Sequence, residues 1–293
     1  MLASNDWLEQ NDKEFAADKA DAMRVNIGYP DWIMDDTKLD NHYGDMENFE
    51  GAAYFNNVRK YTKWSLNITL GRLREPVNKE EWGMSPATVN AYYSPTENKI
   101  VFPAAILQPP FYHKDLPWYV NYGGMGVVIG HEITHGFDDE GRQYDKDGNL
   151  KAWWSDQSID RFKERAQCIV DQYSAFTMPE TGQNLNGKQT QGENIADNGG
   201  LKESFKAYKD NAKDQPKLPG LSLTEEQMFF LSYGQVWCSL YRPEGVESAI
   251  LTNPHSPGRY RVIGPTQNSQ SFADAYKCKS GSYMNPKKKC QIW

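Results

Sequence analysis

The string His131-Glu132-Ile133-Thr134-His135 decides how this chain is interpreted. Two histidines four residues apart lie on one face of a helix, where their imidazole rings can converge on one metal ion. Glu132 is offset by one residue, so its carboxylate lies beside such a metal and can accept a proton from the water that the metal activates. At this composition, the number of His-acid-x-x-His strings expected by chance is about 0.01. The string therefore predicts a zinc hydrolase, and the alternative is a pair of ordinary helical histidines.

A zinc site in a hydrolase has three protein ligands and one open position. The pattern HExxHxxGxxH, with a third histidine ligand, is excluded because positions 138 and 141 hold Asp138 and Gly141. A carboxylate is therefore the attractive third ligand. The string GENIADNGG at residues 192–200 supplies Glu193, and Asp197 follows one turn later on the same helical face, where it can accept the free N–H of a ligand imidazole. An isolated acidic pair is more often a solvated face, but the neighbouring small residues permit close helix approach.

Composition excludes several classes of protein. The 293 residues are 39% apolar and 13% aromatic, enough for one large catalytic unit or a core with an appended lobe. The net charge of −7 lacks the positive excess that nucleic-acid binding requires. No uncharged run reaches the length of about 20 residues that a membrane-spanning helix needs. Residues 1–15 lack the apolar stretch of a secretion signal.

The four cysteines, at positions 168, 238, 278 and 290, are far apart and form no CxxC pair. This spacing excludes a zinc ribbon. Buried cytosolic thiols and a disulfide framework both remain open. The sequon Asn67-Ile68-Thr69 gives weak support to the second alternative, with Asn67 as a glycosylation site.

Periodicity and capping signals predict a mainly helical chain with one hairpin, formed by Val89–Tyr93 and Lys99–Phe102. A polar helix is expected over residues 5–25, and a second helical stretch over Met46–Leu73. Further helices are predicted over Gly123–Phe137, after the cap Ser155, over Gly192–Lys209, and from the capping box at Thr224 to Trp237. Residues 252–268 are rich in proline, glycine and asparagine.

Six strings of the chain, in the same order, resemble the catalytic region of the neprilysin and endothelin-converting-enzyme family of zinc endopeptidases. They are VNAYY (89–93), IVFPA (100–104), HEITHGFDD (131–139), GENIADNGG (192–200), HSPG (255–258) and CQIW (290–293). The resemblance implies an α+β, mainly α fold: a thermolysin-like zincin catalytic domain with a small β component, from which the family's amino-terminal capping lobe is missing. We expect residues 1–75 to be a helical lead-in that packs on a zinc metallopeptidase catalytic domain at 76–293.

The resemblance also implies roles for individual residues. One zinc ion per chain would bind to His131, His135 and Glu193, and Glu132 would be the general base. Asp197 and Asp138 would orient the ligands. The remaining implied contacts are with substrate: Asn90 and Ala91 to its backbone, His255 to the oxyanion, and Arg261 to a carbonyl or carboxylate.

A large apolar substrate side chain, on the carboxyl side of the scissile bond, would enter a pocket of five residues. These are Ile106, Phe111, Val127, Val128 and Trp237. Without the resemblance, plain core packing is the favoured interpretation of these five side chains.

The function implied is a zinc-dependent endopeptidase that hydrolyses short peptides on the amino side of large apolar residues. The alternative is a truncated, non-catalytic form that binds peptides or partners. The intact HExxH and GENIAD strings favour the enzyme, whereas the missing lobe favours the alternative. A zinc aminopeptidase would share HExxH and a glutamate ligand but would need an amine-binding acidic motif, which the sequence does not show.

Family members are usually membrane-anchored or secreted ectodomains, so the resemblance implies an extracellular or cell-surface glycoprotein. It also implies a disulfide between Cys168 and Cys290. Cys238 and Cys278 would pair with cysteines of an amino-terminal part that this chain lacks. The chain is therefore expected to be a portion of a longer protein, without a membrane segment of its own.

Overall fold

The computed structural model describes residues 2, 5–212 and 215–293, and it is mainly helical with one small sheet. The expected α+β, mainly α class is confirmed. The elements are α1 (Gln10–Asp21), β1 (Arg24–Gly28), α2 (Asp36–Tyr43), α3 (Tyr54–Gly71), β2 (Tyr92–Ser94), β3 (Lys99–Pro103), α4 (Trp118–Asn121), a π-helical turn (Tyr122–Gly126), α5 (Val127–His135), α6 (Asp156–Ser174), α7 (Gln191–Asn211), α8 (Glu225–Val236), α9 (Pro243–Thr252), α10 (Gly258–Asn268) and α11 (Gln270–Ala275).

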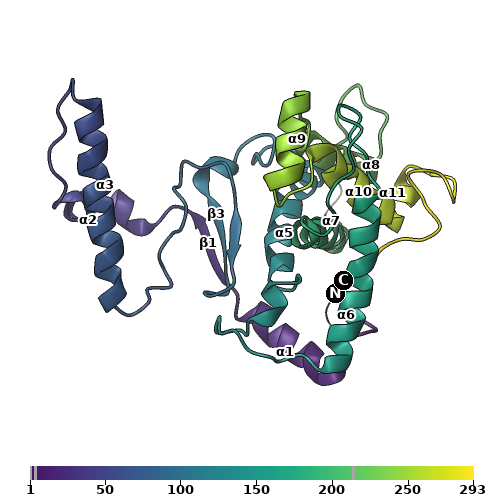
Figure 1. Ribbon diagram of the computed structural model, residues 1–293. Helices are drawn as coiled ribbons and strands as arrows, with labels where there is room; N and C mark the ends of the chain where they lie inside the picture. The colour runs from purple at the N-terminus through teal and green to yellow at the C-terminus, as the bar shows by residue number, and fades with distance from the viewer. Residues whose placement is uncertain (1, 3–4, 213–214) are drawn as a thin grey trace.

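Helices α5 and α7 lie at the centre of the molecule (Figure 1). The small sheet flanks α5 on one side, α6 lies on the other, and α1 crosses below them. The two ends of the chain meet near α6, where the indole Nε1 of Trp7 donates a hydrogen bond to the carbonyl oxygen of Ile292 at 2.7 Å. The pair α2 and α3 stands apart, beyond the sheet.

The central contact, between α5 and α7, depends on glycine. A Cβ atom at Gly200 would lie 2.6 Å from the backbone nitrogen of His131, and one at Gly130 would lie 2.9 Å from the Cα of Gly200. A Cβ at Gly199 would meet the side chain of Thr134 at 2.5 Å. The two backbones therefore approach more closely than any larger residue allows. This is the close helix approach that the small residues around Glu193 predict.

The sheet has the strand order β1-β3-β2, so β2 is an edge strand. Strands β2 and β3 pair antiparallel, which confirms the predicted hairpin. The predicted helix over residues 5–25 is wrong at both ends: α1 begins at Gln10 and ends at Asp21. Residues Arg24–Gly28 form β1, parallel to β3. The backbone partners of β1 come from residues about 75 positions later, and a local periodicity could not reveal them.

Local capping signals predicted helix starts more accurately than composition did. Ser155 caps α6, and Thr224 forms the predicted capping box of α8 with Gln227. The stretch expected to be helical from Met46 becomes helical only at Tyr54. The segment 252–268 contains α10 from Gly258 onward, and only the short connection before it is a loop.

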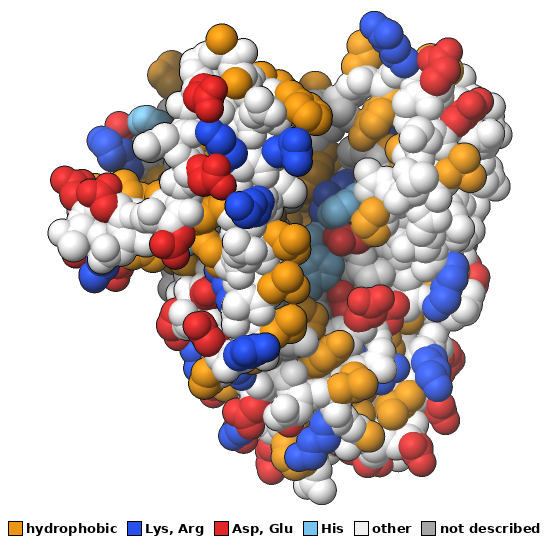
Figure 2. Space-filling view, turned by 60° about the vertical axis from the view of Figure 1, so that its left-hand side comes forward, with side chains coloured by type: hydrophobic (Ala, Val, Ile, Leu, Met, Phe, Trp, Pro, Cys, Tyr) orange, Lys and Arg blue, Asp and Glu red, His pale blue; other side chains and the backbone are white. Residues whose placement is uncertain are grey.

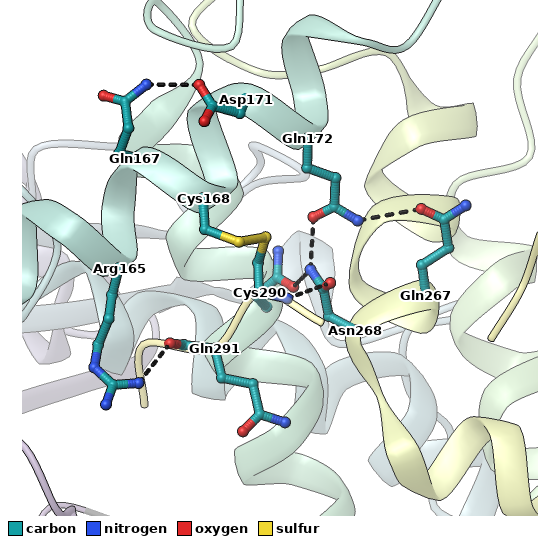
Figure 3. The surroundings of a disulfide bond; sticks show 10 residues. Arg165, Gln167, Cys168, Asp171, Gln172, Gln267, Asn268, Cys290 and Gln291 are labelled. Atoms are coloured by element: carbon teal, nitrogen blue, oxygen red, sulfur yellow. Dashed lines mark hydrogen bonds between the residues drawn. A yellow bond between two sulfur atoms is a disulfide. The ribbon is translucent and has the colours of Figure 1, made fainter. Parts of the chain in front are cut away.

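The structure contains the Cys168–Cys290 disulfide that the resemblance implies, while Cys238 and Cys278 are free. The bond joins α6 to the carboxyl-terminal tail (Figure 3). Beside it the amide of Asn268 donates to Gln172 and accepts from the backbone nitrogen of Cys290 at 2.9 Å. This network fixes the last residues of the chain against α6 and the end of α10.

The segment 1–75, of which residues 1 and 3–4 lie outside the described part, contains two different kinds of structure. Helix α1 packs on the body, where the Asp12 carboxylate accepts hydrogen bonds from the backbone and hydroxyl of Ser155. Helix α3, by contrast, exposes large apolar side chains such as Phe55 and Leu66. The division into a lead-in and a catalytic domain at 76–293 stays a prediction. Among the described helices, none has the length and apolarity needed to cross a bilayer.

We predict that Gly200→Ala destabilises the fold, because the added methyl group meets the backbone of α5. The expected loss in the free energy of unfolding is about 1–3 kcal/mol, as for other overpacked cores. Gly234→Ala is the matched control, since Gly234 also lies within a helix and its added Cβ would meet only Val262 at 3.9 Å. That control should be neutral or slightly stabilising. Equal losses in urea denaturation would contradict the close-contact interpretation.

We predict that a thiol reagent labels only Cys238 and Cys278 in the folded, non-reduced chain. Reduction of the Cys168–Cys290 bond, which closes a loop of 122 residues, should lower the free energy of unfolding by about 2–5 kcal/mol. Peptide mapping after labelling checks the pairing. Labelling of all four cysteines without reductant would refute it.

Candidate metal centre and substrate cleft

Three side chains from α5 and α7 converge on one point. His131 and His135 lie one turn apart on α5, and Glu193 lies in the first turn of α7. The two imidazole Nε2 atoms are 3.0 Å apart. The Glu193 Oε2 atom lies 3.2 Å from Nε2 of His131 and 3.4 Å from Nε2 of His135. The backbone contact at Gly200 brings the two helices near enough for this meeting.

This set of donor atoms fits a metal ion. Zinc–ligand bonds of about 2.0–2.1 Å at tetrahedral angles place ligand atoms about 3.3 Å apart, close to the three separations observed. Two imidazoles and one glutamate are also a donor set of catalytic zinc sites. The buried Glu193 Oε2 has no hydrogen-bond partner in the described part of the chain, although imidazole nitrogens surround it. His131, His135 and Glu193 can therefore hold a metal together.

A carboxylate faces the Nδ1 atom of each imidazole and orients the ring. The Nδ1 atom of His135 lies 2.7 Å from Asp138 Oδ2, and the other oxygen of Asp138 accepts the backbone N–H groups of Glu140 and Gly141. The Nδ1 atom of His131 lies 2.8 Å from Asp197 Oδ1, an ion-pair contact whose angle falls short of a hydrogen bond. With Nδ1 facing a carboxylate, each ring directs Nε2 toward the metal position.

A buried arginine balances one of these carboxylates. Arg261 donates to both oxygens of Asp197, from Nε at 2.8 Å and from Nη2 at 2.7 Å. Its guanidinium also stacks on Trp237, 3.7 Å from the ring centroid. Burial raises the pKa of Asp197, but Arg261 and His131 outweigh that effect and lower it to about 2. Asp197 is therefore ionised at neutral pH.

The electrostatics of the ligand set favour a cation. Burial alone raises the pKa of Glu193, but the facing imidazoles hold it well below its ordinary value. Burial lowers the pKa of His131 and of His135, and the neighbouring carboxylates more than offset that effect. Without a metal, the carboxylates of Glu193 and Asp197 therefore favour protonated imidazoles. A bound divalent cation takes the place of those protons as the positive charge that the carboxylates face.

Glu132 occupies the position expected of a proton acceptor. It lies on α5 between the two histidines, lines the cleft and is 5% exposed. Burial raises the pKa of its carboxyl group, and the positive charges of His131 and His135 counteract part of this increase. A carboxylate with a raised pKa is a better general base near neutral pH than an exposed one.

His255 reaches the same point from the loop between α9 and α10. Its Nε2 atom lies 3.2 Å from Glu193 Oε2, so three imidazoles surround one carboxylate oxygen. The neighbouring Ser256 hydroxyl donates to Asn194 Oδ1 at 2.7 Å, and the Asn194 amide donates to the Thr190 hydroxyl. This buried chain anchors the His255 loop to α7. No spacing or motif predicts Ser256 and Asn194 as positioning residues, although each is adjacent to a predicted site residue.

A cleft of about 890 Å³ opens over the metal position. Figure 2 shows histidine side chains deep within it and apolar side chains along one wall. The residues before the edge strand β2 line it: the exposed Asn90 accepts the backbone N–H of Ala91 through its own side chain. An edge strand beside a cleft can pair with an extended peptide. All fifteen residues expected to bind metal or substrate, or to act beside them, line this cleft.

The five predicted pocket residues differ in accessibility. Ile106 and Val127 are each only 3% exposed, so they contribute mainly to the core. Phe111, Val128 and Trp237 are partly exposed and can form the surface that a substrate side chain would meet. Asn67 does not belong to the cleft: it lies exposed on α3, within a helix. Lys188 and Asp139 also line the cleft. Asp139 ends the string HEITHGFDD but was given no role, and none of the quoted strings contains Lys188.

Comparisons with known proteins agree with this geometry. The family model described as peptidase family M13 matches residues 90–292. The chain is 50% identical to the endothelin-converting enzyme homolog of Locusta migratoria, with 98% of this chain covered, and 47% identical to endothelin-converting enzyme 1 of Homo sapiens, with 100% covered. It spans only 40% and 38% of the lengths of these two relatives.

Solved structures resemble the whole chain as well. A zinc metalloprotease of Mycobacterium tuberculosis, solved in complex with an inhibitor, superimposes with a TM-score of 0.89 at 34% identity. PepO from Lactobacillus rhamnosis gives a TM-score of 0.88 at 31% identity. Each comparison covers 100% of this chain and 44% of the other. The expected metalloprotease fold is thereby confirmed.

We predict that Glu193→Gln abolishes tight zinc binding, because an amide is a poor ligand for the ion. Asp197→Asn should weaken zinc affinity by about 10- to 100-fold, as for other partners of metal-bound histidines. Asp210→Asn, which changes an exposed acid on the same helix, is the control and should bind zinc normally. Chelator competition measures all three. Full affinity in Glu193→Gln would make another residue the third ligand, with His255 the nearest candidate.

Proposed function

The chain belongs to peptidase family M13, and we propose that it is a zinc-dependent endopeptidase that cleaves short peptides on the amino side of large apolar residues. Membership confirms the resemblance to the neprilysin and endothelin-converting-enzyme family. The single observation that supports the activity most strongly is the convergence of His131, His135 and Glu193 beside the buried carboxylate of Glu132. Neither a peptide-binding module nor a packed core requires that combination.

The proposed chemistry assigns one task to each group. A zinc ion bound by His131, His135 and Glu193 would supply a Lewis acid that polarises the substrate carbonyl and activates water. Glu132 would accept the proton from that water and pass it to the leaving amine. His255 would donate its Nε2–H to the negative charge that develops on the carbonyl oxygen.

Substrate would bind along the edge strand. Asn90 and the backbone at Ala91 would hydrogen-bond the peptide beside β2, which extends the sheet by one strand. The partly exposed Phe111, Val128 and Trp237 favour a large apolar side chain after the scissile bond. Arg261 already donates two N–H groups to Asp197, from Nε and Nη2. It would therefore bind the substrate carbonyl through its remaining N–H groups.

We further propose that the chain acts on the extracellular side of the cell, and that Asn67 is glycosylated there. The Cys168–Cys290 disulfide supports an oxidising compartment. Asn67 is exposed, as a glycosylated residue must be. The second candidate function is binding of peptides in the same cleft without turnover.

A peptide assay separates the two functions. We expect the zinc-loaded chain to hydrolyse a short fluorogenic peptide with leucine or phenylalanine after the scissile bond. Glu132→Gln should bind zinc normally and lose at least about 10²-fold in kcat, because the amide cannot accept a proton. Glu140→Gln, an exposed carboxylate that also lines the cleft, is the control and should remain active.

Two outcomes would contradict the proposal. Near-wild-type turnover by zinc-loaded Glu132→Gln would remove the role given to Glu132. Absence of turnover by the zinc-loaded wild-type chain, together with retained peptide binding, would establish the non-catalytic function instead.

A further inference from the structure

Lys19 is a buried lysine that no part of the proposed chemistry uses. It lies near the end of α1, and only 1% of its surface is exposed. Its ammonium group donates three hydrogen bonds, to the carbonyl oxygens of Gly136 at 2.7 Å, Gly141 at 2.6 Å and Tyr144 at 2.8 Å. These three acceptors use all the donors that a lysine has.

The three carbonyls belong to the loop that directly follows the metal-binding helix. Gly136 comes immediately after His135, and Gly141 and Tyr144 lie beyond Asp138, so Lys19 joins the two ends of this loop. Gly141 in turn donates its backbone N–H to Asp138 Oδ1 at 2.7 Å. The other oxygen of Asp138 is 2.7 Å from His135 Nδ1. A continuous series of contacts therefore leads from Lys19 to a proposed metal ligand.

The burial of this lysine is costly. Loss of solvent lowers the pKa of Lys19 to about 7, even though the carboxylates of Asp138 and Asp145 raise it. The rings of Phe137, Tyr93 and Trp153 lie 5.5 to 5.9 Å from the ammonium nitrogen, so they enclose the charge and offset part of that cost. The three hydrogen bonds to backbone carbonyls must offset the rest of that cost.

We propose that Lys19 is a positioning residue of the metal centre. It holds the 136–144 loop, and with it Asp138, in the place from which Asp138 orients His135. The proposal rests on the proposed metal site but not on turnover. The M13 family model matches only residues 90–292, and Lys19 lies on α1, outside that region. The proposal therefore extends the metal centre to a helix that the family model does not cover.

Lys99 offers a matched control within the same chain. It is also fully buried, and it also contacts three oxygens: the carbonyls of Lys79 at 2.8 Å and Glu81 at 2.6 Å, and the Glu97 carboxylate at 2.8 Å. These partners do not belong to the 136–144 loop. Loss of Lys99 should therefore cost stability without affecting the metal ligands.

The test compares Lys19→Met and Lys99→Met in the 293-residue chain, with Zn²⁺ affinity measured by chelator competition. We expect Lys19→Met to bind zinc about 10-fold more weakly, the lower end of the range for residues that orient a ligand. The visible absorption spectrum of bound Co²⁺, which reports ligand geometry, should change as well. Lys99→Met should lose stability but keep the wild-type affinity and spectrum. Wild-type affinity and spectrum in Lys19→Met, or equal changes in both variants, would overturn the proposal.

A second measurement needs no variant and applies even if Lys19→Met does not fold. Coupling between two sites is reciprocal, so zinc binding must stabilise the contact between α1 and the loop if Lys19 positions the ligands. Amide hydrogen exchange across residues 10–21 should slow when zinc is added to the wild-type chain, while exchange across residues 77–83 stays the same. Unchanged exchange in α1, with slower exchange in α5 and α7, would overturn the proposal.

These readouts distinguish the two proposals from each other. Zinc binding without peptide turnover would contradict the endopeptidase function and leave the role of Lys19 intact. Failure of the wild-type chain to bind zinc would contradict both.

Discussion

The backbone contact between α5 and α7 is the constraint on which the rest of this structure depends. A methyl group at Gly200 would lie within 2.6 Å of the His131 nitrogen, so the helices can meet only through glycine. The contact brings two turns of polar residues face to face, with His131 and His135 on one side and Glu193 and Asp197 on the other. The neighbouring elements hold this pair in place: the sheet packs beside α5, and α6 and α10 pack against α7.

The centre of the site was predictable because its information is local. The spacing of His131 and His135 fixes their common helical face, and the spacing of Glu193 and Asp197 does the same for a second helix. Small residues near Glu193 indicated that the two helices could approach closely. Ser155 and Thr224 marked helix starts correctly because a cap needs only its own next few residues. The resemblance supplied the residues that no spacing could connect, such as His255 and Arg261.

What the sequence could not predict depends on distant partners. Strand β1 exists because β3 supplies its hydrogen bonds, and the pattern of residues 24–28 does not show this. The buried contacts of Ser256 with Asn194, and of Lys19 with the 136–144 loop, join residues 62 and more than 100 positions apart. Ile106 and Val127 contribute to the core more than to the cleft wall. In each case the deciding contacts join residues that are distant in the sequence, and local periodicity does not report such contacts.

Anomalous diffraction at the zinc edge, from crystals of the zinc-loaded chain, tests most directly whether His131, His135 and Glu193 bind the metal. We expect one anomalous peak per chain, about 2.0–2.2 Å from the Nε2 atoms of His131 and His135 and from a Glu193 oxygen. The carboxylate of Glu132 should lie beside the metal without coordinating it. A peak elsewhere, or one coordinated by Glu132 in place of Glu193, would refute this ligand set.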